Sequence, residues 1–122
     1  MAVKPVKIWG HYGFHCVLNE RSPKKPEYIF GYVGVDPLHP WFAKSGGDIL
    51  IRDYHGLHVT WGGELPGNSF VSIPAAWWVG FCTEHSFHTA EDYCNRLAWE
   101  AWEAKVNPRL KAEDTSRAAP GG

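Results

Sequence analysis

Three side chains near residue 85 have the types and the spacing of a metal site. Cys82, His85 and His88 follow one another at intervals of three residues. In a loop, such short spacings let thiolate and imidazole ligands converge on one Zn²⁺ or a similar divalent ion at about 2.0–2.3 Å. With an open fourth position the site would be catalytic, whereas a fourth ligand from His39 or His55 would close it as a structural site. The alternative is a buried Cys82 with histidines that only form hydrogen bonds.

Further histidines have the chemistry of an acid and a base. Because imidazole titrates near neutral pH, several of these side chains in one cleft would suit proton transfer in hydrolysis. Tryptophan rings beside them would stack on a polar, nucleotide-like ligand, although aromatic residues in strands more often belong to the core. The predicted catalytic residues are His39, His55 and His85, and the predicted ligand-binding residues are His58, Trp61 and Trp78.

The common sequence signatures of catalysis are absent. The chain contains no phosphate-binding G-x-x-x-x-G-K-[ST] loop, no G-x-G-x-x-G, no G-x-S-x-G nucleophile turn and no H-E-x-x-H helix. Its acidic residues are scattered and form no obvious catalytic pair. The sequence therefore leaves open whether the protein is an enzyme.

A strand and a helix must position the Cys-His segment. Residues 77–81 are apolar and bulky enough for a buried strand, and a helix is expected to follow with Thr89 as its N-cap. Asn107-Pro108 should end that helix. Its apolar stripe at helical spacing is predicted to comprise Tyr93, Leu97 and Ala101.

The remaining chain is rich in strand signals. Residues 6–18 indicate a bent strand or a tight hairpin, and residues 28–35 give the clearest strand. Residues 48–54, 57–61 and 70–73 are also expected to be strands. Strands followed by one helix predict an α+β fold with a mostly antiparallel sheet of about five to six strands and one main C-terminal helix. Residues 1–107 would form a single domain and residues 108–122 a flexible tail.

Charge and composition argue against two classes of partner, nucleic acid and membrane. Twelve basic and 13 acidic residues among 122 argue against general binding of nucleic acid, which needs many phosphate-neutralising cations. No apolar window approaches 18 residues, so no membrane partner is expected. Three cysteines without framework spacing indicate a reducing cytoplasm. Trp99 and Trp102 lie partly off the apolar stripe of the helix, where they could pack at the sheet margin or form the surface of a homodimer.

Three segments together resemble a family of small uncharacterised proteins of bacteriophages and prophages. They are Gly31–Val35 leading to His39-Pro40, His55-Gly56 leading to Gly62-Gly63, and Trp77–Phe81 leading to His85. The resemblance covers roughly residues 28–105. It implies a phage origin, the cytoplasm of the infected or lysogenic host, and a shared pocket that contains the three matching histidines.

The chain departs from that family at two positions. In the family pattern an Asp follows the Gly-Phe pair and another follows the His by three residues, whereas Cys82 and His88 occupy these places here. A carboxylate-based site would therefore have changed its chemistry in this chain. The resemblance implies no established activity.

Two functions are favoured by the sequence over a third, a structural part of the virion, to which no feature of the chain points directly. In the first, the chain is a binding or a hydrolytic domain whose His-lined cleft takes a metal ion or a polar, nucleotide-like ligand. In the second, a phage accessory protein acts by contact with a host protein, for instance as an inhibitor of a host defence system, and the histidines are incidental.

Overall fold

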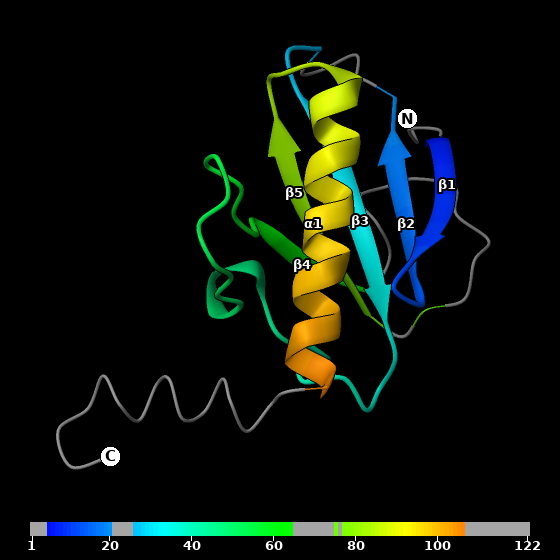
Figure 1. Cartoon of the computed structure of the whole chain (residues 1–122), viewed down its shortest axis with the longest axis vertical. Helices are drawn as coiled ribbons and strands as arrows, with labels where there is room; N and C mark the ends of the chain where they lie inside the picture. The colour runs from blue at the N-terminus through cyan, green and yellow to red at the C-terminus, as the bar shows by residue number, and fades with distance from the viewer. Residues whose placement is uncertain (1–4, 21–25, 65–74, 76, 107–122) are drawn as a thin grey trace, which may run out of the picture.

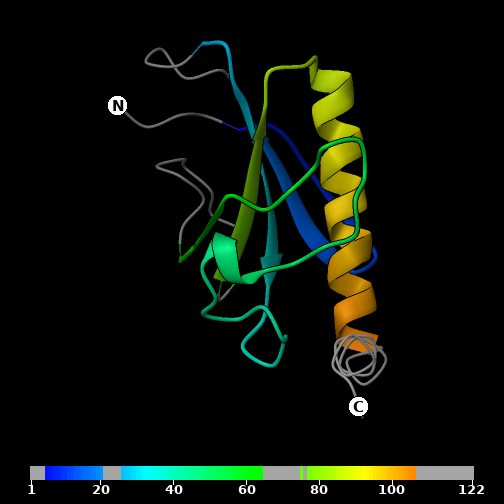
Figure 2. The ribbon, with the colours of Figure 1, turned by 90° about the vertical axis from the view of Figure 1, so that its left-hand side faces the viewer.

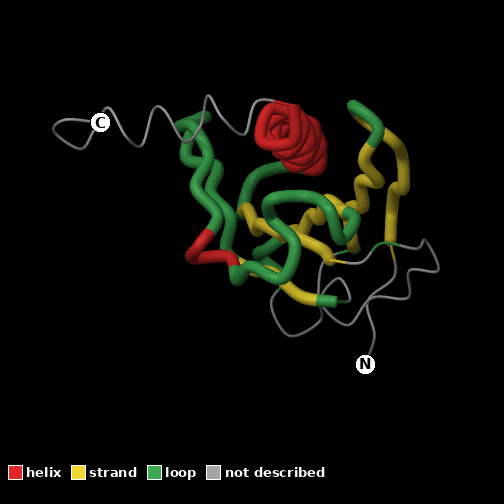
Figure 3. The backbone as a smooth tube through the Cα atoms, turned by 90° about the horizontal axis from the view of Figure 1, so that it is seen from below, coloured by secondary structure: helices red, strands yellow, loops and turns green. Residues whose placement is uncertain are grey.

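One antiparallel sheet carries a long helix on a single face (Figures 1 and 3). The structure is a computed structural model that describes residues 5–20, 26–64, 75 and 77–106. The sheet order is β1-β2-β3-β5-β4, so β1 and β4 form its edges. The elements are β1 (Pro5–His11), β2 (Phe14–Asn19), β3 (Ile29–Val35), a 3₁₀ turn (Gly46–Asp48), β4 (Trp61–Gly63), β5 (Trp77–Thr83) and α1 (Phe87–Val106).

The predicted α+β class is confirmed, with five antiparallel strands and one main helix. The segment 6–18 is a hairpin, since β1 and β2 pair around a two-residue turn at Tyr12-Gly13. The strand predicted at 28–35 is β3. None of the described helices is long and apolar enough to cross a membrane. The strand predicted at 70–73 and the tail predicted at 108–122 lie outside the described residues.

Two predicted strands, 48–54 and 57–61, are wrong. Residues 49–60 instead form a loop that runs alongside the helix, and the strand β4 comprises only Trp61–Gly63 (Figure 2). The pattern misleads because Ile49, Leu57 and Val59 are buried while their neighbours are exposed, as in a strand. Here the apolar side chains enter the core from an irregular backbone that is folded by a turn.

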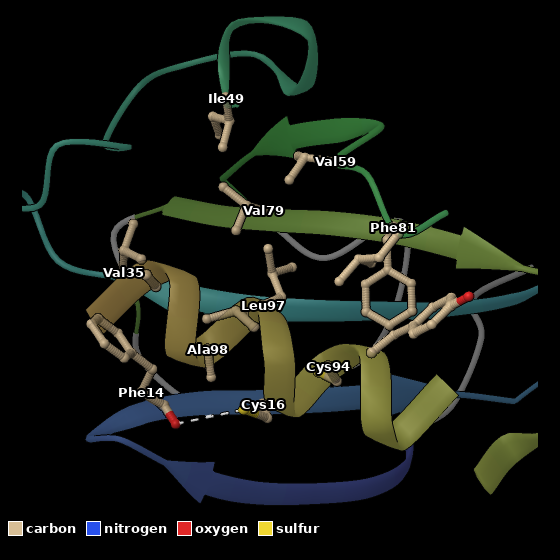
Figure 4. Packing of buried hydrophobic residues seen from close by; sticks show 14 of the residues in the cluster. Phe14, Cys16, Val35, Ile49, Val59, Val79, Phe81, Cys94, Leu97 and Ala98 are labelled. Atoms are coloured by element: carbon tan, nitrogen blue, oxygen red, sulfur yellow. Dashed lines mark hydrogen bonds between the residues drawn. The ribbon is translucent and has the colours of Figure 1, made fainter. Parts of the chain in front are cut away.

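Strand alternation divides the sheet into two apolar faces. Toward the helix, Cys16, Val79 and Phe81 meet buried helix positions (Figure 4). Val33 belongs to the same cluster. Those helix positions recur every three or four residues and are Ala90, Cys94, Leu97, Ala98, Ala101 and Ala104. The small residues let the helix lie close to the strands, and Leu97 fills the centre with no exposed surface. This interface fixes the helix and therefore everything that its outer side presents.

The opposite sheet face has its own aromatic cluster. Val17, Tyr32 and Trp78 are buried together there, and Trp61 packs edge-on against Tyr32 at a ring distance of 5.4 Å. Burial raises the pKa of the Tyr32 phenol to about 12, so this ring is neutral at physiological pH. The cluster is a second core.

The helix begins earlier than the sequence suggests. It starts at Phe87, and the Ser86 hydroxyl accepts a hydrogen bond from the Thr89 backbone N–H at 3.2 Å. Ser86 is therefore the N-cap, and the prediction of Thr89 is wrong because Thr89 is the third helical residue. Both residue types suit a cap, so only the backbone geometry distinguishes them.

Replacing Ser86 by alanine should lower the free energy of unfolding by about 1 kcal/mol, because the substitution removes the cap acceptor. Urea denaturation followed by circular dichroism measures the change. Thr89→Ala is the matched control and should have a smaller effect, since alanine is the better residue inside a helix. A larger loss for Thr89→Ala than for Ser86→Ala would contradict this assignment.

Candidate functional site

His39 lies buried between the loop after β3 and the helix. Its side chain is 4% exposed, and both ring nitrogens are used. Nδ1 accepts from the Trp41 backbone N–H at 2.9 Å, and Nε2 lies 2.8 Å from the Ala101 carbonyl oxygen. Since Nδ1 is an acceptor, Nε2 must carry the proton that is donated to Ala101. His39 thereby ties the loop after β3 to the C-terminal half of the helix.

The three predicted catalytic histidines do not meet in one cavity. His55 contacts the helix at Tyr93, whose hydroxyl donates a hydrogen bond to the His55 carbonyl at 2.6 Å. His39 contacts the helix at Ala101, eight residues further along. That separation is about 12 Å along the axis. His85 precedes the helix, whose first residue, Phe87, lies about 21 Å from Ala101 along the axis. Their catalytic roles stay predictions, and the expected convergence is not found.

The Cys-His segment is divided between two sides of the sheet. Cys82 alternates with Phe81 and Thr83 in β5 and shares the Trp78 face, which points away from the helix. His88 belongs to the first turn of the helix on the other side. Within the part of the chain that is described, no three His, Cys, Asp or Glu side chains are placed to hold a metal ion. The predicted Cys82, His85 and His88 site is therefore not preformed.

The predicted ligand-binding residues are likewise separate. Trp78 is 1% exposed and Trp61 packs on Tyr32, so both rings serve the second core. His58 is exposed, and its Nδ1 lies 2.9 Å from the Gly56 carbonyl oxygen within the same turn. The alternative interpretation of the tryptophans as core residues fits this arrangement.

A different cluster gathers aromatic side chains at the surface. Trp99, Trp102 and Val106 recur at helical spacing on the outer side of the helix, and the tip of the β1–β2 hairpin adds Tyr12. The Tyr12 and Trp102 rings lie 5.4 Å apart. Tyr12 is 48% and Val106 46% exposed, and both tryptophans are half-buried. We call these four residues the aromatic helix face.

The backbone at Tyr12 is strained. Tyr12 and Gly13 have φ angles of 52° and 83°, as the two central residues of a type I′ hairpin turn require. Asn-Gly or Gly-Gly is the usual solution, because a β-carbon in this region costs about 1 kcal/mol. The tyrosine therefore lowers the stability of the turn and places an aromatic ring at the surface.

Arginines border the aromatic helix face on the side of the loop 49–60. The Arg96 and Arg52 guanidinium groups lie 4.4 and 5.2 Å from the Trp99 ring centre. Each is also paired with a carboxylate, Arg96 with Glu100 at 3.0 Å and Arg52 with Glu103 at 3.2 Å. The charges are thus largely balanced within the fold, which suits contact with protein better than with phosphates.

The sequence pattern points to two residues of the aromatic helix face, Trp99 and Trp102, with packing at the sheet margin as the alternative to a partner surface. It does not connect Tyr12, or the bordering Arg52, with them. Tyr12 carried a readable signal, since a bulky residue before the glycine of a two-residue turn violates the turn chemistry. The loop position of Arg52 carried none, because residues 48–54 have a strand-like pattern.

Comparisons of the chain with family models, with curated protein sequences and with solved structures found no match.

Proposed function

We propose that this chain is a contact domain that binds another protein through the aromatic helix face. The observation that carries the proposal is Tyr12, which has a positive φ, is about half exposed and has its ring beside that of Trp102. Strained residues that the fold could relieve by substitution concentrate at functional positions. Tryptophan, tyrosine and arginine are also the types that dominate binding energy at protein interfaces.

The narrower form of the proposal is a phage accessory protein whose partner is a host protein. It is supported by the sequence resemblance alone and remains an expectation. A second copy of this chain is the other partner that the aromatic helix face would accept. Sedimentation velocity at increasing protein concentration separates the two, because only self-association changes the sedimentation of the purified protein.

Tyr12→Asn should reduce partner binding by about 2 kcal/mol, the size of an interface hot spot, with little change in stability. Losing the ring contact with Trp102 should lower the free energy of unfolding by about 1 kcal/mol. Asparagine tolerates a positive φ better than tyrosine, and this should raise the free energy of unfolding by a similar amount. Affinity capture from bacterial lysate, together with urea denaturation of each variant, measures both quantities.

The matched control is Tyr12→Phe, which keeps the ring and should capture the same protein as the wild type. A protein retained by the wild type and Tyr12→Phe but lost with Tyr12→Asn supports the proposal. Equal capture by all three chains would refute it. A fall in stability well above 1 kcal/mol for Tyr12→Asn would instead assign the ring a structural role.

A further inference from the structure

A pocket of about 210 Å³ lies where the loop after β3 meets the C-terminal part of the helix. Trp41, Ile49 and Ala104 give it apolar walls, and Lys44 and Asp48 line it as well. A dry apolar cavity of about 150 Å³ accepts benzene, so this volume is sufficient for one branched or aromatic side chain. The pocket does not involve the aromatic helix face.

The wall that carries both charged residues is rigid. The backbone is closed by Asp48 N–H donating to the Ser45 carbonyl at 3.0 Å, and the Ser45 hydroxyl donates to the Asp48 carboxylate at 2.9 Å. The Lys44 carbonyl accepts from the Trp77 indole N–H at 2.8 Å. Gly46 packs directly on the backbone of β4. The segment 44–48 is therefore positioned before any ligand arrives.

The pocket presents one charge of each sign. Among the residues that the structure describes, neither Lys44 nor Asp48 takes part in an ion pair. They lie four positions apart on either side of the turn and line the same pocket without neutralising each other. A ligand that carries both charges and an apolar group would satisfy all three features of this pocket.

Two features beside the pocket are unfavourable for the stability of the folded chain. Ala43, immediately before Lys44, has a φ of 63°, which is unfavourable for alanine. Leu50 lines the pocket and is nevertheless 81% exposed. A ligand that covers Leu50 would bury this apolar surface, and the strained backbone at Ala43 is typical of segments that position ligand groups.

We propose that this pocket binds a free α-amino acid with an apolar side chain. The side chain lies against Trp41, Ile49 and Ala104, the ligand carboxylate faces Lys44, and the ligand ammonium faces Asp48. The two ligand charges share one carbon atom, and the flexible stem of lysine allows the Lys44 ammonium to approach the carboxylate. This role is independent of protein binding through the aromatic helix face.

NMR titration with L-leucine and L-phenylalanine tests the proposal on the full chain. We expect a Kd of about 1 mM or lower and shift changes at residues that line the pocket. Lys44→Gln and Asp48→Asn should each weaken leucine binding about tenfold, because each removes a hydrogen bond between charged groups. Lys105→Gln and Asp53→Asn are the controls, since both residues are charged and exposed but do not line the pocket.

Leucine derivatives that lack one of the two charges identify which charge each residue binds. N-acetyl-L-leucine lacks the ammonium, so Asp48→Asn should no longer weaken its binding. L-leucinamide lacks the carboxylate, so Lys44→Gln should no longer weaken its binding. The proposal is overturned if capped and free leucine bind equally well, if the pocket variants bind like the controls, or if neither amino acid binds at about 10 mM.

Discussion

Replacing Gly46 by alanine should lower the free energy of unfolding by about 3 kcal/mol, near the upper end of the cost of overpacking. An added β-carbon would overlap the backbone nitrogen of Trp61 and lie 2.5 Å from the Thr60 carbonyl carbon. Both are backbone atoms at the start of β4, so no side-chain rotation relieves the clash. The substitution must separate the 44–48 segment from the sheet edge, which also disturbs the proposed amino-acid pocket.

Gly47→Ala is a closely matched control, because no atom lies within 4 Å of a β-carbon at the next residue. It should change stability by less than about 0.5 kcal/mol, as surface substitutions usually do. Urea denaturation of both variants measures the difference. Similar stabilities for Gly46→Ala and Gly47→Ala would mean that the 44–48 segment is not packed on β4 as described.

The fold class was predictable because its strongest signals are local and periodic. Residues 28–35 and 77–81 are apolar throughout, and both are central strands buried on two faces. The helix pattern at Tyr93, Leu97 and Ala101 matches its buried side. The segment 49–60 was not predictable in this way, because the alternation of buried and exposed side chains at 49–52 and at 57–60 has the same pattern as a strand.

The histidines show why spacing alone could not locate the site. Cys82 and His88 are six positions apart, but a strand that reverses into a helix places their side chains on opposite sides of the sheet. His39 is buried, and its two ring hydrogen bonds occupy the atoms that a catalytic base would need. Such long-range partners, 62 residues apart for His39 and Ala101, leave no trace in the local sequence.

His39→Ala should lower the free energy of unfolding by about 3 kcal/mol. The substitution leaves the buried Trp41 N–H without its acceptor, which costs about 1–3 kcal/mol. The Ala101 carbonyl loses the His39 donor and keeps the hydrogen bond within the helix. The substitution also removes a ring that packs edge-on against Phe14 and Trp41. Chemical denaturation at neutral pH measures the loss, and the exposed His88→Ala is the matched control with little expected effect.

The same residue should make stability depend on pH. Burial lowers the pKa of His39 below 6.5, and the positive charge of Lys105 lowers it further. The hydrogen bond to Ala101 and the negative charge of Asp36 raise the pKa, but burial outweighs them. Below pH 6.5 the unfolded chain therefore binds more protons at this position than the folded chain, so the free energy of unfolding falls as pH falls. Protonated Nδ1 would also face the Trp41 N–H donor.

The pH dependence separates this role of His39 from simple space filling. Wild-type protein and His88→Ala should lose stability in parallel as the pH is lowered from 6.5 toward the folded-state pKa of His39. His39→Ala should start lower and show a shallower decline, because the group that takes up the proton is gone. Parallel curves for all three chains would mean that His39 does not titrate on unfolding, and the assignment of neutral His39 as a buried link between loop and helix would fail.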